Sequence, residues 1–237
     1  MTKTPYENPK ELVLGGLNLV TRSLTLLAKF GLIIYIGKYM SLADLGSYSI
    51  LIGVVYISIQ IFGFDFYQYN TREILSVINS KKAGLVFGQL RLHIFSYLLI
   101  TVPLFFILQH FMPASPMGGL IVIGIVCCEH FSQELTRLFV TLKRPLLANF
   151  ILFVRSGLPL IIFMAVSSVH IEVQNLESLI IFWFWGALSS SVLGIFIILK
   201  TLKRDLIIYP DKEWVVSGIK VAAPFFVMTM FGLVIEW

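Results

Sequence analysis

The sequence contains few charged residues. Asp, Glu, Lys and Arg make up 13% of its 237 residues, while hydrophobic residues make up 57%. About a quarter of the residues of an ordinary soluble domain are charged, so this composition excludes that class of protein. The chain also lacks low-complexity tracts and polar linkers, which argues against a separate soluble domain. We therefore predict an all-α integral membrane protein.

Cysteine and enzyme motifs are also scarce. Cys127 and Cys128 are adjacent and lie in an apolar segment, which excludes a disulfide framework and the spaced pairs of redox and zinc sites. The chain contains no HExxH, GxSxG or GxxxxGK[ST] motif. We therefore predict a protein that is not an enzyme and that has no catalytic residues, metal or cofactor.

The sequence contains several long runs of apolar residues. A bilayer core about 30 Å thick is crossed by about 20 helical residues. Six complete runs of this length are followed by a seventh that continues to the last residue. Pro103 and Pro159 fall inside runs and predict kinks. We expect spans at residues 12–35, 45–66, 85–108, 120–142, 146–166, 179–199 and 215–237.

Lys and Arg are concentrated in every second connection. Lys38 is the only basic residue in the other connections. Cytoplasmic loops collect positive charge, so this pattern predicts a cytoplasmic N-terminus. The excess of Lys and Arg over Asp and Glu then reflects the topology of the chain and its contact with anionic lipid. It gives no reason to expect a nucleic acid as a partner. The residues predicted to face the cytoplasm are Lys3, Lys10, Arg72, Lys81, Lys82, Lys143, Arg144, Lys200, Lys203, Arg204 and Lys212.

Six basic residues remain inside the predicted spans. At about 2.5–3.5 kcal/mol each, facing lipid would cost on the order of 15–20 kcal/mol, more than the typical net stability of about 5–15 kcal/mol. Those near span ends can extend to the interface, and the others must face protein or water. The six are Arg22, Lys29, Arg91, Arg137, Arg155 and Lys220.

Helical spacing gathers the polar residues of four spans onto one face each. Residues three, four or seven positions apart share a face at 100° per residue. Spans packed with these faces inward would enclose a polar cavity. The faces comprise Asn18, Arg22, Thr25 and Lys29 in the first span, Ser58, Asp65, Tyr69 and Arg72 in the second, Gln89, His93 and Ser96 in the third, and Glu129, His130, Gln133, Glu134 and Arg137 in the fourth.

Several roles for these residues remain open. The i to i+3 spacing of Glu134 and Arg137 fits a structural ion pair as well as a substrate contact. His130 is either a hydrogen-bonded interhelical residue or a proton carrier. Arg22 and Lys29 have no acid at pairing distance in their own span, so another helix, water or an anionic ligand must supply the counter-charge. Candidates for coupling or gating are Asp65, Arg72, Glu129, His130 and Glu134.

Three stretches carry a family resemblance. They are LVTRSLTLLAKFGLIIYIGKYMSLADLGSYSIL at residues 19–51 and FGFDFYQYNTREIL at residues 62–75, together with IKVAAPFFVMTMFG at residues 219–232. The chain resembles the start of polysaccharide export flippases of the O-antigen and capsule type, within the multidrug, oligosaccharidyl-lipid and polysaccharide exporter superfamily.

The resemblance implies a transporter of two six-helix lobes related by an internal repeat. In this interpretation residues 1–11 are a cytoplasmic N-terminus, residues 12–210 form the N-terminal six-helix transmembrane lobe, and residues 211–237 start the second lobe with a seventh helix. We therefore expect the chain to be truncated from a longer protein whose C-terminal lobe is missing. The alternative is a seventh span that ends at the outer surface with Trp237 as an interfacial anchor.

The resemblance also implies a function. Such a flippase moves an undecaprenyl-pyrophosphate-linked oligosaccharide across the cell inner (cytoplasmic) membrane for O-antigen, capsule or exopolysaccharide assembly. Its partners would be this lipid-linked oligosaccharide, membrane lipid, and the polysaccharide polymerase and glycosyltransferases of lipopolysaccharide biosynthesis. The family's cationic, substrate-binding cavity would correspond to Arg22, Lys29, Arg137 and Arg155.

Two alternatives remain. A cation-coupled multidrug exporter of the same superfamily would need a cavity dominated by acids, whereas the first span has two cations and no acid. A non-transporting membrane scaffold of a polysaccharide assembly complex would act only through helix contacts.

Overall fold

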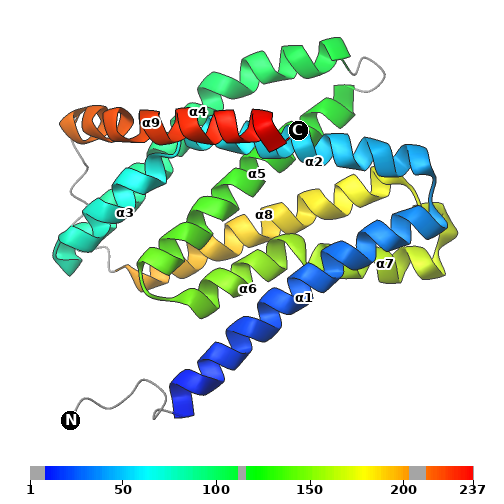
Figure 1. Cartoon of the computed structure of the whole chain (residues 1–237), viewed down its shortest axis with the longest axis horizontal. Helices are drawn as coiled ribbons and strands as arrows, with labels where there is room; N and C mark the ends of the chain where they lie inside the picture. Colours follow the sequence, from blue (N-terminus) through cyan, green and yellow to red (C-terminus); the bar gives the residue numbers. More distant parts are fainter. Residues whose placement is uncertain (1–8, 112–115, 203–211, 237) are drawn as a thin grey trace.

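The computed structural model describes residues 9–111, 116–202 and 212–236. Within these ranges the chain contains α-helices and one 3-10 helix but no strand, which confirms the all-α prediction. The predicted loop cations Lys3, Lys203 and Arg204 lie outside the described residues, as does Trp237. The elements are α1 (Pro9–Tyr39), α2 (Leu42–Gly63), α3 (Phe66–Ser76), α4 (Asn79–Phe111), α5 (Pro116–Thr141), α6 (Pro145–Ser156), α7 (Leu158–Val169), η2 (Ile171–Val173), α8 (Leu176–Thr201) and α9 (Lys212–Glu236) (Figure 1).

Seven helical segments of the described chain are long and apolar enough to cross a membrane. They coincide with the seven predicted spans to within a few residues at most ends, which confirms a multi-pass membrane protein. Their bounds are Leu12–Tyr39, Leu42–Gly63, Lys81–Phe106, Gly118–Thr141, Pro145–Val169, Leu176–Thr201 and Lys212–Leu233.

The second span ends in a sharp break. Phe64 and Asp65 both adopt the left-handed conformation, with φ of 47° and 50°, and α3 begins directly after them. The predicted polar face from Ser58 through Asp65 to Arg72 was therefore wrong as one continuous helical face. The start of α2 is conventional, because Ser41 and Asp44 form a capping box with Asp44 N donating to Ser41 Oγ over 3.0 Å.

The fifth span consists of two helices. Pro159 has no backbone N–H, so the carbonyl of Arg155 has no helical partner, and α6 gives way to α7 at Gly157. The fifth span is thus interrupted close to Pro159, where a kink was predicted, and α4 is assigned as one helix that includes Pro103. On α8, the lack of a side chain at Gly186 allows a close approach, because a Cβ there would lie 2.4 Å from Pro159 Cγ.

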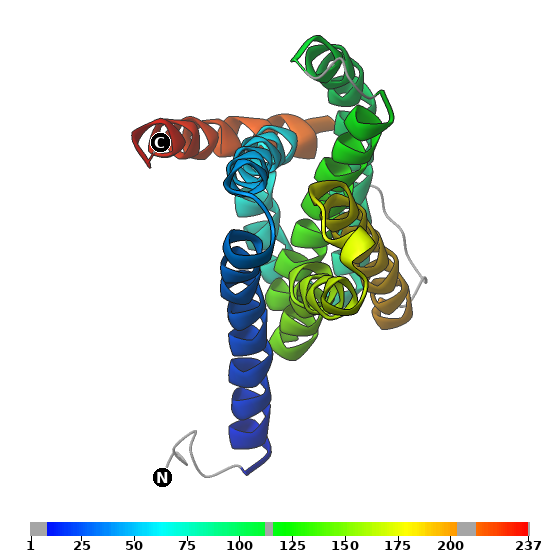
Figure 2. The same ribbon diagram turned by 90° about the vertical axis from the view of Figure 1, so that its right-hand side faces the viewer.

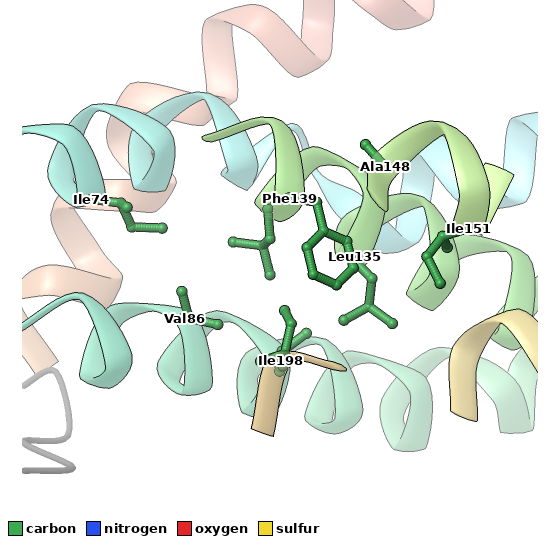
Figure 3. Packing of buried hydrophobic residues seen from close by; sticks show 9 residues of the cluster. Ile74, Val86, Leu135, Phe139, Ala148, Ile151 and Ile198 are labelled. Carbon is green, nitrogen blue, oxygen red and sulfur yellow. The ribbon is translucent and has the colours of Figure 1, made fainter. Parts of the chain in front are cut away.

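Helix α5 is at the centre of the bundle. It contacts α2, α3, α4, α6 and α8, and it runs diagonally through the middle of Figure 1 beside α8. Its apolar side forms a buried cluster in which Leu135 and Phe139 meet residues of four other helices (Figure 3). Those residues include Ile74 of α3, Val86 of α4, Ala148 and Ile151 of α6, and Ile198 of α8.

Helices α1 and α9 lie on the outside of this arrangement. Figure 2 shows α1 running upright along one side, with α9 crosswise to it. Helix α1 packs mainly on α6 and α7, whereas α9 packs mainly on α3 and α2. A Cβ at Gly218 of α9 would lie 2.3 Å from the ring of Phe66, so α9 approaches α3 closely at this glycine.

Candidate functional site

A cavity of about 380 Å³ lies among α1, α2, α5, α6, α7 and α8. We call it the Lys29 cavity. Its walls are mainly apolar and aromatic, with three charged side chains. The lining residues are Lys29, Ile33, Tyr48, Ile52, Val55, Tyr56, Ile59, Glu129, Gln133, Arg155, Ser156, Leu160 and Trp183.

Glu129 is held by partners from two other helices. Trp183 Nε1 of α8 donates a hydrogen bond of 2.6 Å to Glu129 Oε1. Arg155 of α6 places its Nε 3.2 Å from Oε2, and its Nη1 donates to the backbone carbonyl of Glu129 over 3.4 Å. The carboxylate is therefore neutralised and fixed within the protein.

Lys29 has no such partner. Its side chain is exposed, and it forms no hydrogen bond or ion pair with any residue that the structure describes. The cavity therefore contains two cations, Lys29 and Arg155, against the single carboxylate of Glu129. One positive charge is uncompensated, which favours an anionic ligand.

The other two predicted substrate-binding cations lie elsewhere. Arg22 is exposed on α1, two helical turns before Lys29, and is not among the residues that line the cavity. Arg137 Nη1 donates to Glu134 Oε1 over 2.5 Å, and its guanidinium lies 3.7 Å from the ring centroid of Tyr67. The structure thus brings together Lys29 and Arg155, and it forms the structural ion pair that the spacing of Glu134 and Arg137 allowed.

Two of the gating candidates, Asp65 and Arg72, contact α9. Asp65 is 6% exposed and accepts a hydrogen bond of 2.8 Å from Thr229 Oγ1. The Arg72 guanidinium lies 5.9 Å from the ring centroid of Phe225. Both residues therefore lie where the short helix after the α2 break meets the seventh span.

A second polar region is buried between α3, α4 and α5. We call it the Glu134 cluster, and each of its members is at most 1% exposed. It is separate from the Lys29 cavity, whose lining includes none of these residues. The members are Asn70, Gln89, His93, His130 and Glu134.

Hydrogen bonds connect this cluster across its three helices. Gln89 Nε2 donates to Glu134 Oε2 over 2.5 Å, and Asn70 Nδ2 donates in turn to Gln89 Oε1. His93 Nε2 lies 3.4 Å from the same carboxylate oxygen. Each contact joins groups that would otherwise be costly to bury.

The polar residues of α5 are thus divided between the Lys29 cavity and the Glu134 cluster. Glu129 and Gln133 line the Lys29 cavity, whereas His130 and Glu134 belong to the Glu134 cluster. The spacing in the sequence placed all of these residues on one face of the helix, but a face that carries five residues is wide enough to contact more than one neighbouring helix. Two separate polar regions replace the single cavity that the spacing predicted.

Sequence reasoning did not identify the residue of α8 that holds Glu129 in the cavity. Trp183 of α8 packs against other helices, and its Nε1 donates to Glu129. These two residues are 54 positions apart, so no local spacing could relate them. Gln89 and His93, by contrast, share a predicted face at i and i+4, and this was a usable signal for their joint role.

Comparisons with protein-family models, with curated proteins and with solved structures find no match to this chain. The fold and the polar groups define its class, an all-α multi-pass membrane protein with one buried polar cluster and one polar cavity whose lysine is exposed.

Proposed function

We propose that this chain is the N-terminal lobe of a flippase, with the start of a second lobe. The flippase translocates an undecaprenyl-pyrophosphate-linked oligosaccharide across the inner membrane. The observation that carries the proposal is the Lys29 cavity, in which two cations face one carboxylate inside a membrane-spanning bundle. The resemblance of residues 19–51 and 62–75 to polysaccharide exporters supports the choice of substrate.

The chemistry of the cavity suits a phosphorylated sugar. A lysine ammonium acts as a compact point charge toward phosphate, and a guanidinium can donate paired hydrogen bonds to phosphate oxygens. Tyr48, Tyr56 and Trp183 add amphipathic rings to the wall, and such rings offer both an apolar face and a polar tip. The cavity therefore combines groups for the charged and the carbohydrate parts of one ligand.

The size of the cavity sets what enters it. Its volume of about 380 Å³ lies near the lower end of ligand pockets, which span about 300–1,000 Å³. We expect it to receive the pyrophosphate and the first sugar, while the polyprenyl tail remains in the bilayer. Longer glycans then extend out of the cavity.

A broken helix adjoins the cavity. Arg155 and Ser156 line it, and α6 ends at Ser156, one residue before the break at Gly157. Discontinuous helices commonly form the substrate sites of transporters. We propose that the break lets α7 move relative to α6 during alternating access, which changes the position of the Arg155 guanidinium.

The test is Lys29→Gln in cells that depend on this protein for a surface polysaccharide. We expect surface glycan to be lost at unchanged protein level, because the uncompensated charge is removed while Glu129 and Arg155 remain paired. The matched control is Lys38→Gln, since Lys38 is an exposed lysine of the same helix, 5.0 Å from the ring centroid of Tyr39. Normal glycan in the Lys29 variant would refute the proposal.

The same variants separate the alternatives. If the protein is a cation-coupled drug exporter, Lys29→Gln should alter drug resistance and leave surface glycan normal. If it is a non-transporting scaffold, Lys29→Gln should leave both partner binding and glycan translocation unchanged. The balance of two cations and one acid in the cavity favours the anionic substrate.

A further inference from the structure

The Glu134 cluster is not used by the proposed function. Within it, His93 of α4 and His130 and Glu134 of α5 each offer one ligand atom, and these atoms lie within 4.8 Å of one another. We propose that these three residues bind a divalent transition-metal ion of the Zn²⁺ class. Two histidines and one glutamate form a known type of zinc ligand set with an open fourth position.

The spacing of the ligand atoms fits such an ion. A tetrahedral zinc ion with bonds of about 2.0–2.1 Å places its ligand atoms about 3.3–3.4 Å apart. His93 Nε2 is 3.4 Å from Glu134 Oε2, and His130 Nε2 is 4.0 Å from Glu134 Oε1. The first distance already matches the spacing of two zinc ligands, and the side chain of His130 would have to move closer for its Nε2 to complete the set.

His130 supplies an independent reason to expect a ligand. Its Nε2 is buried and has no hydrogen-bond partner among the residues that the structure describes, and the whole residue is 0% exposed. A buried polar nitrogen without a partner is costly. The other ring nitrogen, Nδ1, lies 2.6 Å from the Tyr97 hydroxyl, which can accept a hydrogen bond from Nδ1–H and so leave the lone pair of Nε2 free for an ion.

Glu134 is oriented in the same manner. Arg137 donates to Oε1 and Gln89 donates to Oε2, each over 2.5 Å, and Asn70 fixes Gln89. Hydrogen bonds of this kind to a ligating carboxylate hold it in position and tune the site. The lone pairs that remain on the carboxylate are available to an ion between the two imidazoles.

The charge of Arg137 opposes a cation here, and two features offset it. Glu134 is itself an anion. In addition, α2 ends at Gly63, where a Cβ would lie 2.9 Å from His130 Nε2. The C-terminal end of a helix carries partial negative charge, so the end of α2 favours a cation beside His130. Imidazole ligands select transition metals over Na⁺, Mg²⁺ and Ca²⁺.

Cobalt provides a direct test with the full chain, purified in detergent without a polyhistidine tag and stripped with a chelator. We expect Co²⁺ to bind at one ion per chain and to give the visible absorption of a tetrahedral site, and Zn²⁺ to displace it. His93→Gln and Glu134→Gln should each weaken binding by more than about 100-fold, since changes to outer partners alone cost about 10–100-fold. The control is His170→Gln, because His170 is exposed in the connection after α7.

The readout does not involve glycan, so it is independent of the proposed transport. No cobalt binding by the wild-type chain would overturn the proposal, as would equal binding after His93→Gln. If the variants do not fold, X-ray absorption of the zinc-loaded wild-type chain decides. Scattering from two imidazoles and a carboxylate supports the site, and any other ligand set overturns it.

Discussion

Lys29 and Arg155 reach the same cavity from different helices, yet they are held differently. Arg155 is paired with Glu129, so its charge is already balanced, whereas Lys29 lacks an ion-pair partner within the described chain. This difference makes Lys29 the residue whose charge is available to a ligand. The free-energy cost of placing a basic residue in lipid predicted that both side chains would face protein or water. It could not predict that Arg155, and not Lys29, would form the ion pair with Glu129.

The hydrogen bond from Trp183 to Glu129 gives a prediction at this scale. We expect Trp183→Phe to lower the free energy of unfolding by about 1–3 kcal/mol, because a carboxylate that is 7% exposed loses a donor. The control is Trp185→Phe on the same helix, where the side chain is 58% exposed, and its effect should stay within about 0.5 kcal/mol. Denaturant unfolding in detergent measures both, and equal effects would contradict this role for Trp183.

At the scale of helices, breaks in two spans shape the molecule. The break at Gly157 and Pro159 could be predicted, because proline removes a donor wherever it stands in a helix. The break at Phe64 and Asp65 could not, since neither residue is the glycine that left-handed positions favour. The division of the polar face of α5 was also beyond sequence reasoning, because it depends on which helices become its neighbours.

The contact between α7 and α8 gives a prediction about packing. A Cβ at Gly186 would lie 2.4 Å from Pro159 Cγ and 2.9 Å from the Arg155 carbonyl oxygen. We expect Gly186→Ala to destabilise the chain by about 1–3 kcal/mol through overpacking. Gly16→Ala is the control, because a Cβ there meets no atom of the described residues within 4 Å, and the substitution should stabilise the helix by up to about 1 kcal/mol.

A double-mutant cycle locates the strain. Because the nearest obstruction is the Pro159 ring, Gly186→Ala should cost less in a Pro159→Ala background, with a coupling of at least about 0.5 kcal/mol. Thermal or denaturant unfolding of the four chains in detergent measures it. Additive effects would mean that the backbone at Arg155, and not the proline ring, limits the approach of α8.

For the whole molecule, the seven spans were predictable because their length and apolar composition are set by the bilayer. The position of α9 across α2 and α3 was not, since a helix that is apolar on most sides can pack in many ways. Its contacts with Asp65 and Arg72 connect the break after α2 to the seventh span.

The orientation of the chain remains a prediction that labelling can test. Chains without Cys127 and Cys128 would carry one new cysteine, at Lys143 between α5 and α6 or at Glu172 between α7 and α8. A membrane-impermeant thiol reagent should label Glu172→Cys in intact cells and Lys143→Cys only after the cells are opened, because basic connections stay in the cytoplasm. The reverse pattern would place the N-terminus outside.

The most direct measurement for the central claim is the binding of a polyprenyl pyrophosphate to the purified chain, followed by ligand-dependent thermal stabilisation in detergent. We predict that the wild-type chain and Lys38→Gln bind alike, and that Lys29→Gln binds at least about tenfold more weakly, since a charge-assisted hydrogen bond contributes about 1.5–3 kcal/mol and 1.4 kcal/mol corresponds to tenfold. Equal affinity in all three chains would contradict an anion site at Lys29.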